Sequence, residues 1–305
     1  MEHIYDIIIL GGGPAGYTGA LYAARAGFDT LVIERMSAGG QMTLTDTIDN
    51  YPGFPDGKDG FELGMNMQQG AEKYGAITEY AEVESVDFSD KTKIINTSNG
   101  IFYAKAVIIA TGANPRKLGL PDEEKLTGRG IHYCAHCDGR FYKDKTVVVV
   151  GGGNSAAEDA LYLSALAKKV YVIHRRNELR AEKYYHKALM NAENIEFIWN
   201  SEVHSAVYNE KVTAVKITGT SDNGTLILPC DGIFISIGRE PATQFLKDSV
   251  NIDENGYVIA DETTRTNIDG VFAAGDVRTK DLRQVVTAVA DGAVAVNFAE
   301  KFLRR

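Results

Sequence analysis

The sequence predicts an α/β protein built from two copies of one strand–helix–strand unit, with the second copy inserted into the domain that holds the first. Two glycine-rich loops, at residues 11–16 and 151–156, each follow a continuous apolar run and precede an alanine-rich stretch. A further apolar run at residues 270–277 follows the second copy and is typical of a strand that returns to the first domain. With 305 residues, the chain is long enough for two domains with separate cores.

Composition and charge exclude several classes of protein. The formal net charge of −9 argues against a nucleic-acid partner. The N-terminus lacks a basic region, and the apolar run Ile7–Leu10 is too short for a signal peptide or a membrane span. Of the three cysteines, two lie in one motif, which fits a reducing compartment. We therefore expect a cytoplasmic protein that does not bind membranes.

The first unit has the features of a dinucleotide site. Asp6–Leu10 reads as a strand buried on both faces, followed by a loop, a helix over Tyr17–Ala26 and a second strand over Thr30–Ile33. The loop residues Gly11, Gly13, Pro14, Ala15 and Gly16 allow a tight turn, close approach to a pyrophosphate and tight packing of the helix. Glu34 lies where a carboxylate accepts a hydrogen bond from a ribose hydroxyl. The alternative is a glycine turn that binds nothing.

Loops and strands that could complete this site follow. Gly40 with Gln41, and Asn50, belong to polar loops that could wrap a long cofactor or be plain surface loops. Residues 61–75 look helical, and Val83–Phe88, Thr92–Asn96 and Phe102–Tyr103 read as a short meander. Residues 106–110 read as another buried strand. It ends in the site residues Ala110, Thr111 and Gly112, after which Pro115 indicates a domain exit.

The second unit repeats the plan with one informative difference. A strand over Thr146–Val150, a glycine loop, a helix over Ala157–Ala167 and a strand over Val170–Ile173 follow in order. The loop contributes Gly151, Gly153, Asn154 and Ser155 to the expected site. Where the first unit has an acid, this one has basic side chains, namely His174, Arg175, Arg176 and Arg180. Guanidinium groups clamp a 2′-phosphate, so this site is predicted to prefer NADPH; a solvated basic patch is the alternative.

The remaining chain closes both domains. Four antiparallel strands are expected over 196–199, 202–207, 212–217 and 225–228, then a final strand over 231–238. Gly275 and Asp276 end the strand at 270–277, where an Asp can accept a hydrogen bond from a flavin's ribityl chain. Arg283, Gln284 and Val285 open a terminal helix through Phe302. A core strand and helix without a ligand would look similar. The predicted domains are 1–113 with 242–305, and 114–241.

A cysteine pair precedes the second unit. Cys134 and Cys137 are separated by two residues and followed by Asp138, a spacing that usually carries redox chemistry in an intracellular chain. Residues 138–145 read as a turn leading directly into the strand of the second glycine loop. His132 and His136 with the two thiols could be read as a zinc site, but structural zinc usually draws its ligands from two separated knuckles. We expect no metal, and Cys230 reads as an inert core thiol.

Taken together, these motifs resemble the low-molecular-weight thioredoxin reductases of bacteria and archaea. The resemblance spans nearly the whole chain and rests on the order of both glycine loops, Gly40-Gln41, residues 110–113, Cys134–Gly139, residues 174–176, 273–276 and Arg283-Gln284. It implies two Rossmann-like, three-layer ββα domains, with an NADPH domain inserted into an FAD domain, and a homodimer. It also implies that Cys137 accepts electrons from the flavin, that Cys134 attacks the disulfide of thioredoxin, and that Asp138 is the acid and base for the thiols.

Two positions depart from the family pattern. His136 stands where Thr or Val is commonest, and Arg140 stands where an aromatic residue is frequent. A charged His136 would perturb the thiols, and Arg140 alters the expected contact with thioredoxin. The other functions considered are a ferredoxin-dependent flavin thioredoxin reductase, which has a degenerate NADPH site, and a non-catalytic nucleotide-sensing flavoprotein, which would not need the cysteine pair.

Overall fold

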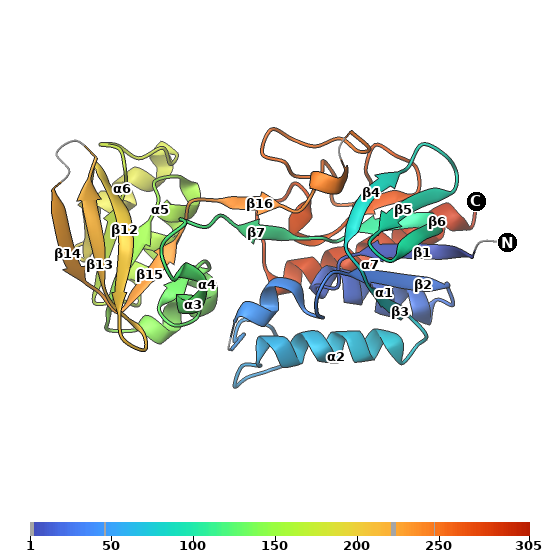
Figure 1. Ribbon diagram of the computed structural model, residues 1–305, viewed down its shortest axis with the longest axis horizontal. Coiled ribbons are helices and arrows are strands. Elements are labelled where there is room, and N and C mark those ends of the chain that lie inside the picture. Colours follow the sequence, from blue (N-terminus) through green and yellow to red (C-terminus); the bar gives the residue numbers. More distant parts are fainter. Residues whose placement is uncertain (1–2, 46, 221–223, 247) are drawn as a thin grey trace. The chain divides into compact units, whose positions relative to one another are not determined.

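The computed structural model describes residues 3–45, 47–220, 224–246 and 248–305. The chain divides into two compact units, Met1–Asn114 with Glu240–Arg305 and Pro115–Arg239 (Figure 1). We call the first of these unit 1 and the second unit 2. Among the described residues, no helix combines the length and the apolar character that a membrane span requires.

Unit 1 is built on a seven-stranded sheet. Its strands run in the order β3 (Ile77–Tyr80), β2 (Thr30–Glu34), β1 (Ile4–Leu10), β6 (Gly100–Ile109), β5 (Lys93–Thr97) and β4 (Val83–Asp87), with β17 (Val271–Ala273) also paired to β6. The pairings of β1, β2, β3 and β17 are parallel, whereas β4, β5 and β6 form an antiparallel meander. This confirms the expected return of the chain at residues 270–277 to the first sheet.

One long strand replaces two expected ones. Residues 102–103 and 106–110 were predicted as separate strands, but β6 runs without a break from Gly100 to Ile109. The first half of β6 pairs with β5, and its last three residues pair with β17. β1 pairs with residues 103–109 of β6 and so spans both halves. Because neighbours hold both halves of the strand, the exposed Lys105 in the middle does not interrupt it.

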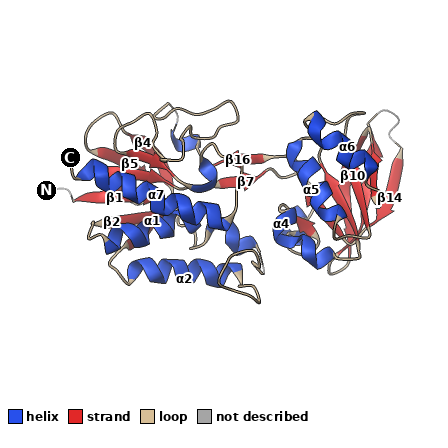
Figure 2. Ribbon diagram, turned by 180° about the vertical axis from the view of Figure 1, so that it is seen from behind, coloured by secondary structure: helices blue, strands red, loops and turns tan. Residues whose placement is uncertain are grey.

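Alternate residues of the central strands face two different layers. Ile7 and Ile9 of β1 pack with the helices α1 (Pro14–Arg25) and α7 (Val285–Leu303), whereas Ile8 and Leu10 pack with Phe88 and Val258 on the other face. The helix α2 (Gly60–Glu72) lies on the same side of the sheet as α1 (Figure 2). Short 3₁₀ segments are η1 (Gly40–Leu44), η3 (Gln244–Leu246) and η4 (Gly275–Val277).

Unit 2 carries a five-stranded parallel sheet and a smaller antiparallel one. The order in the first is β11 (Ile195–Ile198), β10 (Lys169–Ile173), β9 (Thr146–Val150), β15 (Gly232–Ile235) and β8 (Ile131–His132). The second contains β12 (Ser201–Tyr208), β13 (Val212–Gly219) and β14 (Thr225–Pro229). The expectation that residues 196–199 are antiparallel was wrong, because β11 pairs with β10 in parallel and extends the larger sheet. The antiparallel prediction for the other three strands is confirmed.

The larger sheet of unit 2 lies between helices and the smaller sheet. Val147 and Val149 of β9 pack with α5 (Asn154–Ser164) and α6 (Lys183–Asn191), whereas Val148 and Val150 pack with residues of β12 and β13. The short helices are α3 (Glu123–Leu126), α4 (Ala135–Asp138) and η2 (Gly139–Tyr142). This is the predicted three-layer ββα arrangement.

Local predictions were wrong at two helix starts and at one segment predicted as a turn. The helices α1 and α5 begin at Pro14 and Asn154, three residues before the predicted starts, because the glycine loops supply Gly13 and Gly153 as N-caps and lead directly into the first turn. Residues 138–145 were predicted as a turn, yet Asp138 ends α4 and residues 139–142 form η2. The cysteine pair therefore follows a short strand, β8, and opens a short helix.

Two short strands mark where the chain passes between the units. β7 (Ala113–Pro115) pairs with β16 (Arg239–Pro241). Gly112 (φ 71°) and Gly238 (φ 102°) stand beside these strands in the left-handed region that favours glycine. Side chains added at either glycine would meet no atom within 4 Å.

Close packing of α1 on α7 gives a test of the fold of unit 1. A Cβ at Gly292 of α7 would lie 2.2 Å from the carbonyl oxygen of Ala15, so Gly292→Ala must push the helices apart. We expect it to lower the free energy of unfolding by about 1–3 kcal/mol. Gly70→Ala in α2 is the matched control, because nothing lies within 4 Å of the added methyl. It should be neutral or stabilise by about 0.5–1 kcal/mol in urea denaturation. Equal stability of both variants would contradict this packing.

Candidate active site

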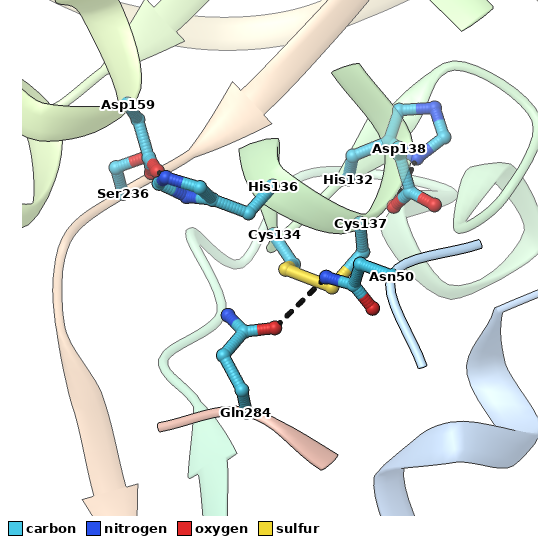
Figure 3. Close-up of a disulfide and its surroundings, with 9 residues drawn as sticks. All are labelled: Asn50, His132, Cys134, His136, Cys137, Asp138, Asp159, Ser236 and Gln284. Carbon is cyan, nitrogen blue, oxygen red and sulfur yellow. Dashed lines mark hydrogen bonds and ion pairs between the residues drawn. A yellow bond between two sulfur atoms is a disulfide. The ribbon is translucent and has the colours of Figure 1, made fainter. Parts of the chain in front are cut away.

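The two cysteines of unit 2 form a disulfide around the first turn of α4. Cys134 is the extended N-cap residue, and its carbonyl accepts hydrogen bonds from the N–H groups of Cys137 (3.3 Å) and Asp138 (3.1 Å). The Cα atoms of Cys134 and Cys137 lie 5.3 Å apart, and their sulfur atoms are bonded (Figure 3). Both residues are partly exposed. A partly exposed disulfide of this kind can exchange with thiols.

Asp138 is held by a histidine that sequence reasoning had only considered as a metal ligand. His132 Nδ1 lies 2.9 Å from Asp138 Oδ2, and His132 Nε2 lies 2.7 Å from the Tyr142 hydroxyl. Burial raises the pKa of Tyr142, helped by the negative charges of Asp138 and Asp231. Three ionisable side chains from β8, α4 and η2 therefore form one line beside the disulfide.

His136, between the two cysteines, faces a second carboxylate. Its ring stacks on Tyr162 of α5 with the centroids 4.3 Å apart. Its Nδ1 lies 4.0 Å from Asp159 Oδ1, and Figure 3 shows the two side chains facing each other. The Ser236 hydroxyl donates to Asp159 at 2.5 Å. Burial raises the pKa of Asp159, although Ser236 and His136 oppose this rise. His132 and His136 thus face different carboxylates, and the two sulfur atoms are joined to each other.

The third cysteine is of a different kind. Cys230 is a free thiol, 4% exposed, and packs against the strands of unit 2. Burial, together with the nearby Asp231 charge, raises its pKa to about 12. Thiolate chemistry is therefore confined to the other two cysteines over the ordinary pH range.

The first glycine loop has the geometry of a phosphate cradle. Gly11 has a φ of 105°, and a Cβ there would lie 2.5 Å from the Ala110 carbonyl oxygen. A Cβ on Gly16 would lie 1.8 Å from the carbonyl oxygen of Gly11, so only glycine lets α1 pack this closely. A Cβ on Gly13 would meet nothing within 4 Å, and no side chain caps the N-terminus of α1. Open space beside free helical N–H groups fits an anion.

Glu34 is fixed by backbone amides beside that loop. Its Oε2 accepts from the Gly12 N–H at 2.6 Å, and its Oε1 accepts from the Met36 N–H at 3.0 Å. Each carboxylate oxygen keeps a further lone pair that could accept from a ribose hydroxyl. A Cβ on Gly12 would lie 3.0 Å from Glu34 Oε2, so the middle glycine of the loop, to which we had assigned no role, makes room for the acid.

The other predicted residues of unit 1 fall into two groups. Around the first loop, Gly40 approaches Gly13, Gln41 Nε2 donates to Asn114 Oδ1 (2.8 Å), and Thr111 Oγ1 donates to the Ala242 carbonyl (2.7 Å). Gly112 allows the chain to leave the sheet there. A Cβ on Gly275 would lie 2.9 Å from Ala15 Cβ, which brings the half-buried Asp276 to the same end of α1.

The second group surrounds the start of α7. Asn50 Nδ2 donates to Gln284 Oε1 at 3.0 Å, and Gln284 caps the helix together with Thr287. Arg283 stacks over Tyr257, 4.1 Å from the ring centroid, and Val285 packs on Met42 and Ile48. Polar side chains, an arginine and a helix N-terminus are therefore brought together in unit 1.

A buried charge cluster fixes the turn that carries Asp276, and no local sequence signal indicated it. Asp291 of α7 accepts from Arg278 Nε (2.8 Å), Lys280 Nζ (2.9 Å) and the Gly275 N–H (2.9 Å). Burial alone would raise the pKa of Asp291, but these hydrogen bonds hold it below its usual range. The partners lie more than ten residues from Asp291, so only the tertiary fold reveals them.

The second glycine loop repeats the first. Gly151 has a φ of 149°, and a Cβ there would lie 2.3 Å from the Ser236 carbonyl oxygen. Gly153 has open space, and the N-terminus of α5 has no side-chain cap. The Asn154 side chain exchanges hydrogen bonds with Glu182, and Ser155 is exposed. This loop also fits an anion.

The basic residues surround this second loop. His174 is buried against Gly152, where a Cβ would lie 2.4 Å from the imidazole ring. Burial, reinforced by Arg180, Arg176 and Arg175, lowers the pKa of His174. The Arg180 N–H donates to the Gly152 carbonyl at 2.7 Å, which fixes this arginine beside the loop. In the part of the chain that the structure describes, the three exposed guanidinium groups make no ion pair.

Comparisons with known proteins all find similarity to one family of oxidoreductases. The profile of the pyridine nucleotide-disulphide oxidoreductase family matches residues 5–292. A thioredoxin reductase of Listeria innocua is 46% identical over 303 residues, covering 99% of this chain and 95% of the relative. A thioredoxin reductase structure from Streptococcus pyogenes has a TM-score of 0.94 and 43% identity, covering 100% and 99% of the two chains. One from Lactococcus lactis, titled as the FR conformation, has a TM-score of 0.69 and 42% identity, covering 98% and 99%.

The Asp291 cluster predicts an acid-sensitive stability. Because the native pKa of Asp291 is lowered, its contribution is complete above the unfolded-state value near 4 and is lost as pH falls below it. Asp291→Asn removes the buried carboxylate that pairs with Arg278 and leaves this buried guanidinium with the exposed Glu262 as its ion-pair partner; it should cost about 3–5 kcal/mol at pH 7, with a weaker dependence on pH below 4. Urea denaturation at several pH values measures both effects. The exposed Asp281→Asn is the control, and an equally small loss in both variants would refute the argument.

Proposed function

Because the chain belongs to the pyridine nucleotide-disulphide oxidoreductase family, we propose that it is an NADPH-dependent thioredoxin reductase with FAD as its flavin. The observation that carries the proposal is the partly exposed Cys134–Cys137 disulfide in the same unit as a glycine loop with exposed arginines beside it. The full-length similarity to thioredoxin reductases supports thioredoxin, or a thioredoxin-like protein, as the substrate.

The two loops divide the cofactors between the units. In unit 1, Gly13, the start of α1, Glu34 and Asp276 would hold FAD, with the residues around Asn50 and Gln284 completing the site. In unit 2, Gly153 and the start of α5 would take the NADPH pyrophosphate, and the arginines would take its 2′-phosphate. When bound, the flavin relays electrons from the nicotinamide to the disulfide.

The two thiols would have different roles once reduced. Cys134 would attack the disulfide of thioredoxin, and Cys137 would then displace it by attacking the Cys134 sulfur. Asp138, next to Cys137 and hydrogen-bonded to His132, would hold and return the proton that the thiols exchange. The high pKa of buried Cys230 supports leaving that thiol out of the exchange.

We further propose that the units rotate about the β7 and β16 crossings during the cycle. The dithiol and the second loop belong to unit 2, while the first loop belongs to unit 1, so electrons must pass between the units twice. Gly112 and Gly238 beside the crossings tolerate large backbone changes. The two solved relatives differ in TM-score at nearly equal identity, which supports more than one conformation among them. Cross-linking the units should permit one half-reaction and block turnover; full turnover would exclude rotation.

By the same resemblance we propose a homodimer that works in the cytoplasm. Sedimentation analysis should give twice the 33.2 kDa chain mass, and a monomer would contradict the dimer.

A ferredoxin-dependent enzyme is the main alternative of the same fold. The arginines and the intact second loop argue against it, and a nucleotide-sensing protein would not need the dithiol.

Coenzyme preference tests the arginine site. Each charge-assisted contact contributes roughly 1.5–3 kcal/mol, so replacing Arg175 and Arg176 by Gln should raise the NADPH KM on the order of a hundredfold and leave the NADH KM nearly unchanged. Arg129→Gln, at an exposed site elsewhere in unit 2, is the control and should change neither value. Steady-state assays with a disulfide dye measure this. Equal use of both coenzymes by the unmodified protein would refute the assignment.

Substitution of each cysteine tests the thiol pathway. Cys134→Ser and Cys137→Ser should each abolish NADPH-driven reduction of thioredoxin, since neither leaves a pair that can form a disulfide. Cys230→Ser should keep most of the activity because its thiol is buried and protonated. Insulin precipitation in the presence of thioredoxin reports turnover. Retained turnover in Cys137→Ser would contradict the scheme.

A further inference from the structure

His132 joins the Asp138 carboxylate to the Tyr142 hydroxyl, and the thiol scheme above gives it no role of its own. Its two ring nitrogens lie 2.9 Å from Asp138 Oδ2 and 2.7 Å from the Tyr142 oxygen. The side chains of His132 and Asp138 are 7% and 14% exposed, and Tyr142 is 8% exposed. Hydrogen bonds so shielded from water are strong and directional.

Rigid elements fix this histidine from three sides. β8 pairs with β15 so that His132 stands opposite Phe234, and the two rings stack with centroids 5.2 Å apart. Tyr142 meets both rings edge-on, and its own place depends on Gly232, where a Cβ would lie 2.4 Å from the phenol ring. His132 is therefore set by strand register, whereas Asp138 stands at the end of the single-turn helix α4.

The direction of the hydrogen bonds follows from the carboxylate. An ionised Asp138 can only accept, so the proton between it and His132 lies on Nδ1. Nε2 of a neutral imidazole then accepts from the Tyr142 hydroxyl, which keeps its proton because burial, with the nearby Asp138 and Asp231 charges, raises the pKa of Tyr142. The remaining nearby groups are Lys145, 5.4 Å from the centroid of the Tyr142 ring, and the exposed His136 on α4.

We propose that His132 is a positioning residue that holds the ionised Asp138 carboxylate beside the thiols through an Nδ1–H donor fixed by Tyr142. The proposal rests on the role of Asp138 in the proposed function and deepens it. An acid that becomes charged during the exchange needs a donor beside it at that moment. The Nδ1–H group of His132 stands within hydrogen-bond distance of Asp138 Oδ2 and supplies that donor.

The protons transferred during the exchange show at which step the Nδ1–H donor of His132 is needed. The Cys134 thiolate attacks the target disulfide, forming a mixed disulfide and releasing one target thiolate, which takes the proton of Asp138. The ionised Asp138 then accepts the proton of the Cys137 thiol, and the Cys137 thiolate attacks the Cys134 sulfur and releases the second target thiolate. Two electrons pass to the target while the dithiol becomes the disulfide. Asp138 is charged in the middle of this sequence, when the Nδ1–H of His132 stabilises it.

Three substitutions separate this role from simple packing. His132→Asn places an amide donor near the position of Nδ1, toward Asp138, and lacks the bond to Tyr142. His132→Gln reaches the position of Nε2, toward Tyr142, and lacks the donor to Asp138. His132→Leu lacks both. Thermal melting of each variant reports its stability. Tyr142→Phe removes only the hydroxyl donor, and it replaces any His132 variant that fails to fold in the measurements below.

The first readout is the pH dependence of thiol alkylation. The protein is reduced with dithiothreitol, desalted and treated with iodoacetamide; buried Cys230 does not interfere below pH 10. A carboxylate without its donor opposes thiolate formation more strongly, so the midpoint should move up by about half a pH unit or more in the Gln and Leu variants. The alkylation midpoint should stay near the wild-type value in the Asn variant. In Tyr142→Phe it should rise by less than in the Gln and Leu variants.

The second readout is kcat/KM for thioredoxin. It should fall roughly tenfold to a hundredfold in the Gln and Leu variants and stay within about threefold of wild type in the Asn variant. An unmoved alkylation midpoint in the Gln variant, or equal losses in the Asn and Gln variants, would overturn the proposal. If the wild-type protein reduced no thioredoxin, the proposed function would fail, while the alkylation midpoints would still decide the role of His132.

Discussion

The close approach of backbone to backbone at the two glycine loops is the constraint on which both units depend. An added Cβ would lie 1.8 Å from the Gly11 carbonyl oxygen at Gly16, and 2.3 Å from the carbonyl oxygen of Ser236, just after β15, at Gly151. Without side chains there, α1 and α5 start directly at the strand ends and point their N–H groups at open space. The same approach brings the residue at the end of the next strand against the middle glycine. That residue is Glu34 in one unit and His174 in the other, and this difference separates the expected cofactors.

The position of the dithiol follows from this constraint in unit 2. Gly139 lets α4 and η2 lie against α5, because a Cβ there would sit 2.9 Å from the Tyr162 ring. His136 stacks on the same ring, and His132 stands on a strand of the sheet that also carries the second glycine loop. The disulfide, its acid and the loop are thus parts of one packed unit. A redox pair fixed to the nucleotide fold in this way cannot adjust on its own, which is why we place the motion of the cycle at the crossings between the units.

Sequence reasoning succeeded where the signal is local and failed where the partner is distant. Buried strands such as the end of β1 and all of β9 are continuous apolar runs, and a glycine loop follows each, so the two strand–helix–strand units were predictable from local sequence. The layer order was expected only from the resemblance to a known family. The sequence of β11 indicates a short strand but not the sheet to which it belongs. Its parallel pairing with β10, a contact with a different segment, places it in the larger sheet.

The same limit applies to the site. Cys134, Cys137 and Asp138 are adjacent in sequence and could be named, but the partner of Asp138 depends on the register of β8 against β15. Asp291 lies in the apolar terminal helix, more than ten residues from Arg278 and Lys280, so no local pattern connects them. In the fold, a carboxylate shared by two cations and a backbone amide holds the turn of Asp276 in place.

We propose that NADPH delivers electrons to the Cys134–Cys137 disulfide within this one chain. Anaerobic incubation of the oxidised protein with one equivalent of NADPH, followed by alkylation and mass spectrometry, tests this transfer without a protein substrate. We expect both Cys134 and Cys137 to become alkylated, Cys230 to stay unmodified, and NADH at the same concentration to give far less labelling. Consumption of NADPH with no alkylation of either cysteine would contradict it.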